Sequence, residues 1–177
     1  MNLYDLNNDN TIINIDGKDI EMKQPICYGK IYDKWLVSKC GKIWSLYYNR
    51  LVTGGESFLR RHGAEKRLQN INLCMSMDKL YYEDGSGNNR TDAKTMRRNI
   101  KYHKVVIDTW APLYDNPPEG IVWKEWEIVR KLPTVYNHIS KTVVIDHIDD
   151  NPANNHLDNL RRVTQWDNQP TRKLKGI

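Results

Sequence analysis

A 27-residue segment near the C-terminus, residues 143–169, restricts the fold more than any other part of the chain. It opens with three β-branched residues, which favour a strand, and Leu160–Val163 predicts a second strand. Residues 148–158 between them are rich in Asn and Asp, a composition typical of a turn-rich loop. Thr164 and Asp167 then form a pair similar to a capping box, which predicts the start of a helix. We therefore expect a strand, a loop, a strand and a helix, in this order.

Carboxylate, imidazole and amide side chains stand at the junctions of this unit. Asp146 and His147 end the first strand, and Asn168 lies in the first turn of the predicted helix. Carboxylate and amide oxygens suit Mg²⁺, and a neighbouring imidazole can take a proton from water near neutral pH. A helix N-terminus also favours a phosphate. The pattern predicts metal-assisted hydrolysis of a phosphodiester.

Two other structures use loops rich in Asn and Asp. An EF-hand loop that starts at Asp146 requires a ligand at Ile148 and a glycine at Asn151, and one that starts at Asp149 requires Glu at Leu160. The sequence meets none of these requirements, so it argues against an EF-hand. A plain Asx-rich hairpin loop without chemistry is the other alternative, and the full pattern of Asp, His and Asn argues against it.

The N-terminal half predicts antiparallel β-structure. Thr11–Ile15 and Lys18–Met22 alternate apolar and polar residues around Asp16-Gly17, the pattern of a hairpin. Gly54-Gly55 is expected to end the meander that follows. Residues 84–92 have the composition of a mobile loop. Four further segments are predicted as strands: 35–37, 43–48, 50–53 and 70–77.

The middle of the chain is less determined. His103–Trp110 is compatible with a helix or a strand, and prolines at 112, 117 and 118 end regular structure. Val122–Lys131 predicts a short helix with apolar residues on one side. The expected fold class is α+β, with an N-terminal antiparallel sheet followed by the unit at 143–169. We expect three parts: a polar N-terminal extension with a hairpin (1–27), a basic β-rich module (28–100) and a region that contains the C-terminal unit (101–177).

The charges are distributed in a way that suits a polyanionic partner. The net charge is +5, from 27 Lys and Arg against 22 Asp and Glu. Residues 50–104 hold twelve bases and six acids, residues 143–160 hold four Asp and no Lys or Arg, and residues 161–177 hold five bases and one acid. Basic flanks around an acidic island could hold DNA phosphates while the island holds a metal. A solvated surface with scattered charge is the alternative.

Composition argues against several other classes of protein. Charged residues are 28% and hydrophobic residues 39%, which favours neither disorder nor a membrane protein, and no apolar run approaches the roughly 20 residues of a spanning helix. Three widely spaced cysteines without a C-x-x-C pair support neither a disulfide framework nor a structural zinc site. The first 25 residues hold five acids and no apolar signal region, so we expect a reducing, cytoplasmic location.

Residues 143–169 resemble the ββα-metal motif of the HNH endonucleases. The match rests on the Asp146-His147 pair, on Asn159 twelve residues after the histidine and on Asn168 nine residues further. It is closest to phage-type HNH homing endonucleases, which often end the motif in Asn. The resemblance implies that Asp146 and Asn168 bind the metal, that His147 is the general base and that Asn159 supports the loop by hydrogen bonds across it.

Two other segments resemble parts of the same family. Residues 32–51 contain Trp-x-Val-Ser-x-x-Gly-x-Ile-x-Ser, similar to the N-terminal β-module of the homing enzymes. Tyr102–Val106 is similar to the histidine-bearing segment before the HNH hairpin, and we expect its His103 to pack or lie near DNA rather than bind metal. Pro112–Thr142 is longer than the family spacing, and Pro170 shortens or kinks the last helix.

The resemblance implies a site-specific, metal-dependent endonuclease that nicks or cuts double-stranded DNA, located in the host cytoplasm if it is encoded by a phage. Mg²⁺ is the expected metal, with Mn²⁺ or another divalent ion as substitutes. Monomer and dimer both remain open. A non-catalytic DNA-binding protein with the HNH fold is the main alternative, and a structural or interaction protein of a phage particle is a third. The residues expected to contact DNA are Trp35, Lys39, Lys42, Trp44, Arg50, Arg60, Arg61, Arg97, Arg98, Arg161 and Arg162.

Overall fold

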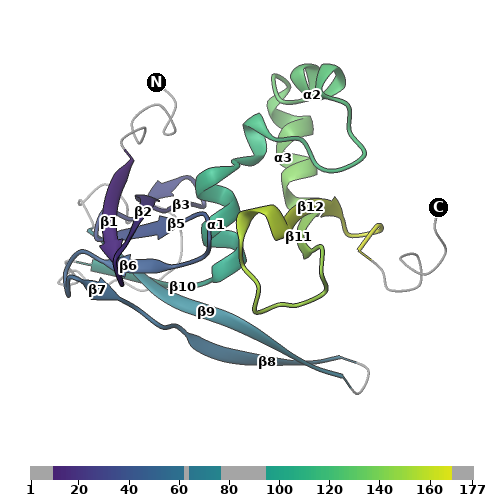
Figure 1. Ribbon diagram of the computed structural model, residues 1–177. Helices are drawn as coiled ribbons and strands as arrows, with labels where there is room; N and C mark the ends of the chain where they lie inside the picture. The colour runs from purple at the N-terminus through teal and green to yellow at the C-terminus, as the bar shows by residue number, and fades with distance from the viewer. Residues whose placement is uncertain (1–9, 62–63, 77–94, 169–177) are drawn as a thin grey trace.

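The computed structural model describes residues 10–61, 64–76 and 95–168. Figure 1 shows an N-terminal sheet on one side, a C-terminal hairpin on the other and helix α1 (Tyr102–Trp110) between them. A long, narrow second sheet runs beneath both. The structure therefore confirms the predicted α+β class with an N-terminal antiparallel sheet.

The N-terminal sheet has five antiparallel strands in the order β1-β2-β5-β6-β7. β1 and β2 form the predicted hairpin, whose turn at Asp16-Gly17 has the positive φ angles (54° and 79°) that suit these two residues. β5 pairs with β2 and with β6, which confirms the predicted meander. A short β3–β4 hairpin lies between β2 and β5 in sequence. The bounds are β1 Thr11–Ile15, β2 Lys18–Lys23, β3 Ile26–Cys27, β4 Lys30–Ile31, β5 Trp35–Ser38, β6 Ile43–Ser45 and β7 Arg50–Leu51.

A second antiparallel sheet has the order β10-β9-β8, with β8 at Gly55–Arg61, β9 at Ala64–Ser76 and β10 at Thr95–Lys101. The strand predicted at 70–77 is the second half of the longer β9, whereas β8 was not predicted. A Gly-Gly pair favours a turn, but Gly55 pairs with Asn70 and begins a strand. The predicted mobile loop at 84–92 lies outside the described residues.

α1 follows β10 directly and settles the segment that fitted either a helix or a strand. α2 (Trp123–Val129) confirms the predicted short helix, and its Trp126 is fully buried and donates from Nε1 to the Tyr114 carbonyl at 3.0 Å. A single 3-10 turn, η2, covers Leu113–Asp115 after Pro112. α3 (Pro133–Thr142) was not predicted; it buries no residue, and only Val135, Tyr136 and Ile139 give it an apolar side. Pro133 at its first turn was the one local sign.

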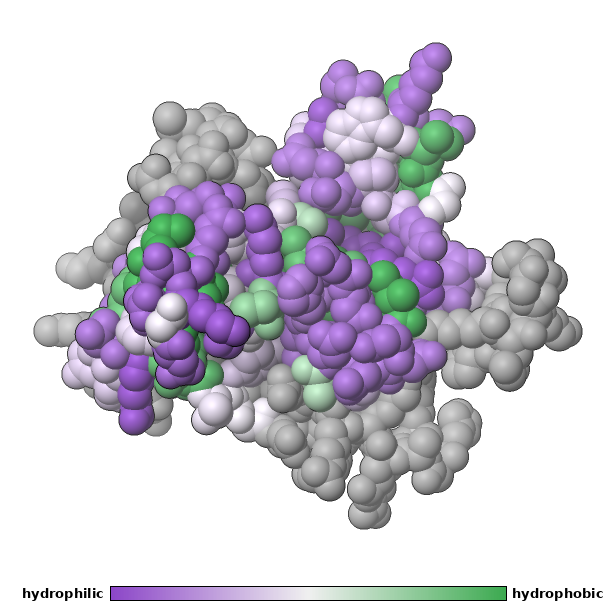
Figure 2. Space-filling model, viewed as in Figure 1, coloured by the Kyte–Doolittle hydropathy of each residue, from purple (hydrophilic) through white to green (hydrophobic). Residues whose placement is uncertain are grey.

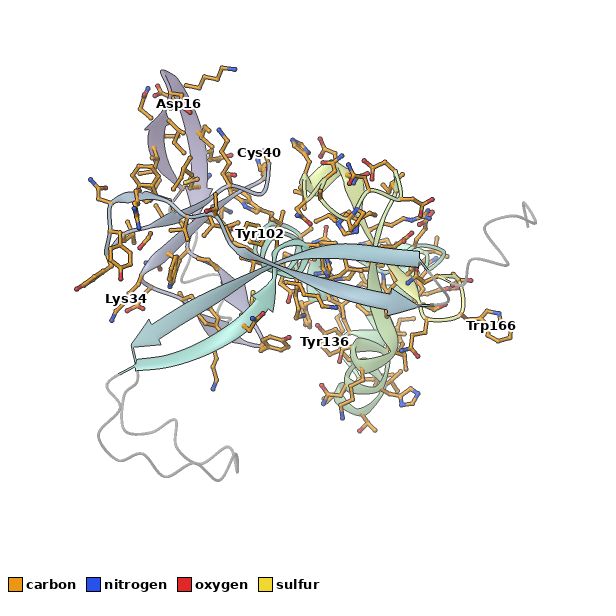
Figure 3. The ribbon with its side chains drawn as sticks, turned by 90° about the horizontal axis from the view of Figure 1, so that it is seen from below. Asp16, Lys34, Cys40, Tyr102, Tyr136 and Trp166 are labelled. Atoms are coloured by element: carbon orange, nitrogen blue, oxygen red, sulfur yellow. The ribbon has the colours of Figure 1, made fainter. Side chains whose placement is uncertain are left out.

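The main core surrounds α1. Residues of the N-terminal sheet, of α1 and of the C-terminal hairpin share one buried cluster: Cys27, Tyr32, Trp35, Val37, Ile43, Ile100, Tyr102, Val105, Val106, Ile107 and Leu160. In Figure 3, Tyr102 lies at the centre of the molecule between the two sides. α1 therefore fixes the C-terminal hairpin against the N-terminal sheet.

The surface shown in Figure 2 is mainly hydrophilic, with hydrophobic side chains over the N-terminal hairpin and the α2–α3 region. Exposed apolar residues of the α2–α3 region are Val122, Trp123, Ile128, Leu132 and Val135. Within the described ranges, no helix has the length and apolar character needed to cross a membrane.

Candidate active site

The C-terminal hairpin pairs β11 (Val143–His147) with β12 (Leu160–Thr164) in antiparallel register. This confirms both predicted strands. Asp146 and His147 end β11 and are each 8% exposed. Asp146 lies opposite Arg161 and His147 opposite Leu160. The hairpin therefore places a carboxylate and an imidazole at consecutive positions of one strand, each largely shielded from water.

The loop between these strands is organised around the Asp149 carboxylate. Its Oδ1 accepts from the Asn151 backbone and from Asn159 Nδ2, and its Oδ2 accepts from Asn154 Nδ2, each at 2.8 Å. Asn159 also accepts from the Asp149 backbone at 3.0 Å and donates to the Asn154 carbonyl at 2.8 Å. The bonds from Asn154, Asn151 and Asn159 lower the pKa of Asp149. The many Asn and Asp residues thus close the loop through their own side chains.

His147 contacts two residues, of which the sequence singled out His103, as a packing residue, but not Asn155. Its Nε2 lies 3.1 Å from Oδ1 of the buried Asn155. The ring of His103 on α1 packs edge-to-face on the His147 ring, with centroids 5.2 Å apart. Burial, and then the neighbouring His147, Lys101 and Lys104, lower the pKa of His103 to about 3. His103 therefore packs against His147 as a neutral ring near neutral pH.

The β5–β6 turn supports the loop that carries Asn155. Gly41 has φ +81°, and a Cβ there would lie 3.1 Å from the Asn155 carbonyl oxygen and 3.2 Å from its Cβ. The Leu157 N–H donates to the Lys39 carbonyl at 2.7 Å. Cys40 marks this turn in Figure 3, where it lies beside the loop. The N-terminal sheet therefore contacts the loop between β11 and β12 through backbone atoms.

We predict that Gly41→Ala destabilises the protein by about 1–3 kcal/mol, because an L-residue is strained at this φ and its Cβ meets backbone atoms that cannot easily move. Urea unfolding would measure the loss. Gly17→Ala is the matched control, since Gly17 has φ +79° with nothing within 4 Å of the added Cβ. Gly41→Ala should lose more stability than the control and should also shift the NMR signals of the His147 ring. Equal losses with an unmoved His147 would contradict the contact.

Asp146 is bound by Arg161 from the facing strand. Its Oδ2 accepts from Nε and from Nη2 of Arg161, each at 3.0 Å, and Nη1 of Arg161 donates to Glu119 Oε2 at 2.9 Å. Burial alone would lower the pKa of Arg161, but the hydrogen bonds and charges of Asp146 and Glu119 raise it. The guanidinium thus lies charged between two carboxylates.

Asn168 lies in a turn that follows β12 directly. Its N–H donates to the Thr164 carbonyl at 3.2 Å, and the Asp167 N–H donates to Thr164 Oγ1 at 3.2 Å. Thr164 Oγ1 also donates to the Asp167 carboxylate. These bonds are those of a capped first helical turn. The rest of the predicted helix lies outside the described residues.

A metal ion at this hairpin would draw on few protein ligands. Among the described residues, no three His, Cys, Asp or Glu side chains form a group that could hold one. The Asp146 carboxylate and the Asn168 amide are hard oxygen donors, which fit Mg²⁺ because this ion keeps several of its waters. Arg161 is the feature that opposes such binding, since it already holds Asp146 Oδ2.

Two of the residues expected to contact DNA are buried. Trp35 is 8% exposed in the main core. Arg162 donates to Asp108 Oδ1 at 3.0 Å, to the Ile107 carbonyl at 3.3 Å and to the Ala111 carbonyl, so it binds the end of α1. This corrects the prediction for both, because side chains enclosed in protein do not present themselves to a DNA surface.

The other predicted contacts lie nearer the surface or on strands whose side chains are not described. Lys39 and Arg50 are exposed, and Lys42 and Trp44 are half-buried. Lys39 also bonds Glu21 at 3.0 Å. The backbone places Arg60 and Arg61 on β8 and Arg97 and Arg98 on β10, and their side chains lie outside the described part of the structure.

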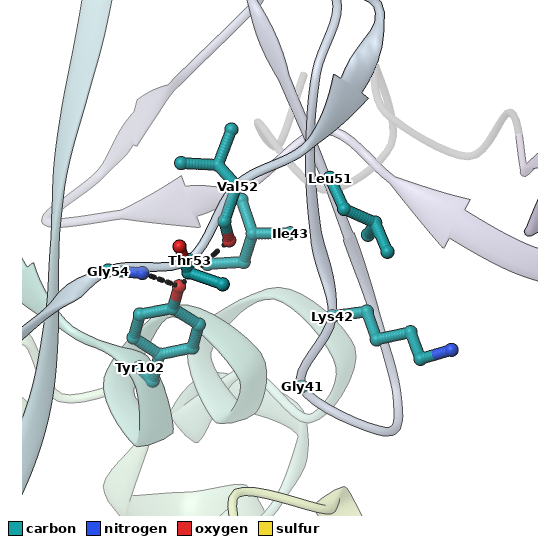
Figure 4. Close-up of a pocket in the computed structure, with 8 residues that line it drawn as sticks. All are labelled: Gly41, Lys42, Ile43, Leu51, Val52, Thr53, Gly54 and Tyr102. Carbon is teal, nitrogen blue, oxygen red and sulfur yellow. Dashed lines mark hydrogen bonds between the residues drawn. The ribbon is translucent and has the colours of Figure 1, made fainter.

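A pocket of about 380 Å³ lies where β6 and β7 meet the start of α1 (Figure 4). Tyr102 Oη accepts from the Gly54 N–H at 2.7 Å and donates to the Val52 carbonyl at 3.1 Å. The lining residues are Gly41, Lys42, Ile43, Leu51, Val52, Thr53, Gly54 and Tyr102. Neither Asp146 nor His147 lines this pocket. Its charged lining residue is Lys42.

Searches against protein-family models and curated proteins find no match. A search of solved structures finds a chain described as "DNA binding and cleavage by the HNH homing endonuclease I-HmuI". That chain is 18% identical, with a TM-score of 0.40, and the similarity covers 80% of this chain and 53% of that one. The present chain therefore spans about half the length of that structure. The function has to be argued from the residues of the present chain.

Proposed function

We propose that this protein is a metal-dependent DNA endonuclease of the HNH type, which hydrolyses phosphodiester bonds. One observation carries the proposal: Asp146 and His147 are consecutive, buried residues at the end of β11, in a hairpin whose loop contacts the imidazole through Asn155. The spacing of Asp146, His147, Asn159 and Asn168 in the sequence supports the same family.

The contacts of His147 favour one of its two ring nitrogens as the base. Asn155 Nδ2 donates to the Ala153 carbonyl at 3.4 Å, so Asn155 Oδ1 faces His147 Nε2. A carbonyl oxygen accepts only, and Nε2 therefore carries the hydrogen in the neutral imidazole. Nδ1 then keeps the lone pair that takes a proton from the attacking water. Asn155 and His103 position the ring for this step.

Asp146 and Asn168 would hold the metal. A divalent ion there would neutralise charge on the phosphate in the transition state and on the leaving oxygen. Asn159 holds the loop closed through its bonds to Asp149 and Asn154. Each of these residues therefore has a distinct task in binding or positioning.

The DNA would lie against basic side chains of the N-terminal sheet and of the C-terminal hairpin. Lys39 and Arg50 are exposed on the N-terminal sheet, and Arg161 borders the site. Such contacts fix the position of the duplex without reading its sequence, because they reach phosphates. Binding should accordingly weaken steeply as salt is added. A flat salt response would argue for the third class, a structural or interaction protein.

The proposal is tested with supercoiled plasmid and purified protein in Mg²⁺ or Mn²⁺. Each protein chain would have one hydrolytic centre, which cuts one strand. We therefore expect a monomer to convert the plasmid to the relaxed form and a dimer that cuts both strands to convert it to the linear form. Addition of EDTA should stop the reaction. Plasmid that remains supercoiled in both metals, with random and candidate target sequences, would contradict the enzyme.

A non-catalytic DNA-binding protein is the second candidate, favoured by one observation. Arg161 satisfies Asp146 Oδ2 with two hydrogen bonds, so the carboxylate has a stabilising partner without a metal. This candidate predicts salt-sensitive DNA binding and no metal-dependent cleavage. The plasmid assay distinguishes the two functions.

We predict that Asn168→Ala slows metal-dependent cleavage by at least about tenfold, because losing even an indirect metal partner costs 10–100-fold. DNA binding measured in EDTA should change little. Gln165→Ala, an exposed position in the same turn, is the matched control and should cleave normally. If Asn168→Ala loses DNA binding instead of metal dependence, its assignment as a ligand is wrong.

A further inference from the structure

We propose that Arg161 couples DNA binding to metal binding. In the DNA-free protein its guanidinium holds Asp146, and a DNA phosphate draws it away so that the carboxylate can accept the metal. This inference rests on the proposed function and adds a requirement for DNA to it.

The contacts place Arg161 where such an exchange can occur. It binds one oxygen of Asp146 with two nitrogens, at 3.0 Å each, and Glu119 with its third nitrogen, at 2.9 Å. The Asp146 side chain is 9% exposed, whereas those of Arg161 and Glu119 are 32% and 56% exposed. Arg161 thus joins a buried carboxylate to the surface, where a phosphate can reach it.

A metal ion and a guanidinium compete for the same carboxylate. Both are cations, and on adjacent oxygens of one carboxylate they would repel each other strongly at this level of burial. A phosphate can offer the guanidinium two oxygens, one for each N–H, whereas Asp146 offers it only Oδ2. Glu119 is too exposed to hold the guanidinium firmly against such a competitor.

The exchange predicts reciprocal effects of the two ligands. If DNA raises the affinity of the protein for a divalent metal, the metal must raise the affinity for DNA by the same factor. Couplings of this kind are typically about 5–150-fold. The DNA-free protein should therefore bind a divalent ion weakly, and the complex should bind it well.

The test measures Mn²⁺ affinity by EPR for the full chain, alone and with a cleavage-resistant phosphorothioate duplex. Without DNA, Arg161→Gln should bind Mn²⁺ about 5–150-fold more tightly than wild type. Adding the duplex should tighten Mn²⁺ binding in wild type and change it little in Arg161→Gln. Arg161→Lys keeps the charge but loses the two-pronged contact, so its affinity without DNA should lie between the other two.

Arg130→Gln is the matched control, because it removes one positive charge and an ion pair to Asp115 at 2.9 Å, between η2 and the end of α2. It should match wild type. If Arg161→Gln fails to fold, Arg161→Lys decides, since it leaves a cation beside Asp146. Equal Mn²⁺ affinities for wild type and the Arg161 variants would overturn the coupling and leave the proposed function standing. If Arg161→Lys binds Mn²⁺ as wild type does and only Arg161→Gln binds it more tightly, net charge alone would explain the effect. This result would also overturn the coupling. Absence of Mn²⁺ binding in every variant, with and without DNA, would overturn both.

Discussion

Replacing His147 with alanine is expected to slow metal-dependent cleavage by roughly 10²–10⁴-fold, the usual contribution of a general base. The ring lies at the end of β11 between Asn155 and the ring of His103. Initial rates of plasmid relaxation in Mg²⁺ or Mn²⁺ would measure the loss. DNA binding in EDTA should persist, because His147 is buried and contacts protein.

The control for this variant is His138→Ala, which removes an exposed imidazole from α3. It should cleave as wild type does. Since His147→Ala leaves space beside the buried Asn155 and the half-buried His103, its fold has to be checked by circular dichroism. Partial recovery of the rate on adding free imidazole would support the role of a base. Undiminished cleavage by a folded His147→Ala would show that another group takes the proton.

Replacing Arg162 with alanine is expected to reduce the free energy of unfolding by about 3–5 kcal/mol, as for other broken buried ion pairs. The Arg162 side chain is 6% exposed and that of its partner Asp108 is 16% exposed. The change would leave Asp108 and the carbonyls of Ile107 and Ala111 without this donor at the end of α1. For a chain of this length the loss corresponds to a fall in Tm of roughly 6–20 °C.

Thermal and urea unfolding would measure the effect of Arg162→Ala. Lys39→Ala is the matched control, because its pair with Glu21 is exposed and such pairs contribute about 0–1 kcal/mol. A fall in Tm no larger than that of Lys39→Ala would show that Arg162 does not tie β12 to α1. The stability of Arg162→Ala therefore tests whether Arg162 serves the fold, as its contacts indicate, rather than contacting DNA, as its charge alone suggests.

Elements with local turn chemistry could be predicted from the sequence. The Asp16-Gly17 hairpin and the two strands of the C-terminal hairpin were found, because alternation and turn residues act over a few positions. α1 could not be assigned, since sheet and hairpin cover it from several sides and its consecutive buried residues Val105–Ile107 obscure the helical period. β8 was missed because its pairing with β9 follows a glycine pair that favours a turn.

The sequence predicted the site residues that are close together in the chain, but not the contacts between residues that are far apart in it. Asp146 and His147 follow from a strand that ends in polar residues. Gly41 and Asn155, by contrast, are far apart in sequence and meet only in the folded protein. Arg161 and Arg162 look alike in sequence, yet alternation along β12 turns one toward Asp146 and the other toward α1. Which face α1 covers is a property of tertiary packing.

The backbone contact between the β5–β6 turn and the loop between β11 and β12 limits which fragments of the protein can keep the candidate site intact. A fragment that begins at residue 101 would keep Asp146, His147 and Asn168, but it would lack the Lys39 carbonyl that receives Leu157 and the glycine against which Asn155 packs. The C-terminal hairpin therefore cannot be transferred to another protein by itself and keep the same loop contacts. A chimera in which another N-terminal sheet replaces this one would have to keep residues 39–41 together with the loop.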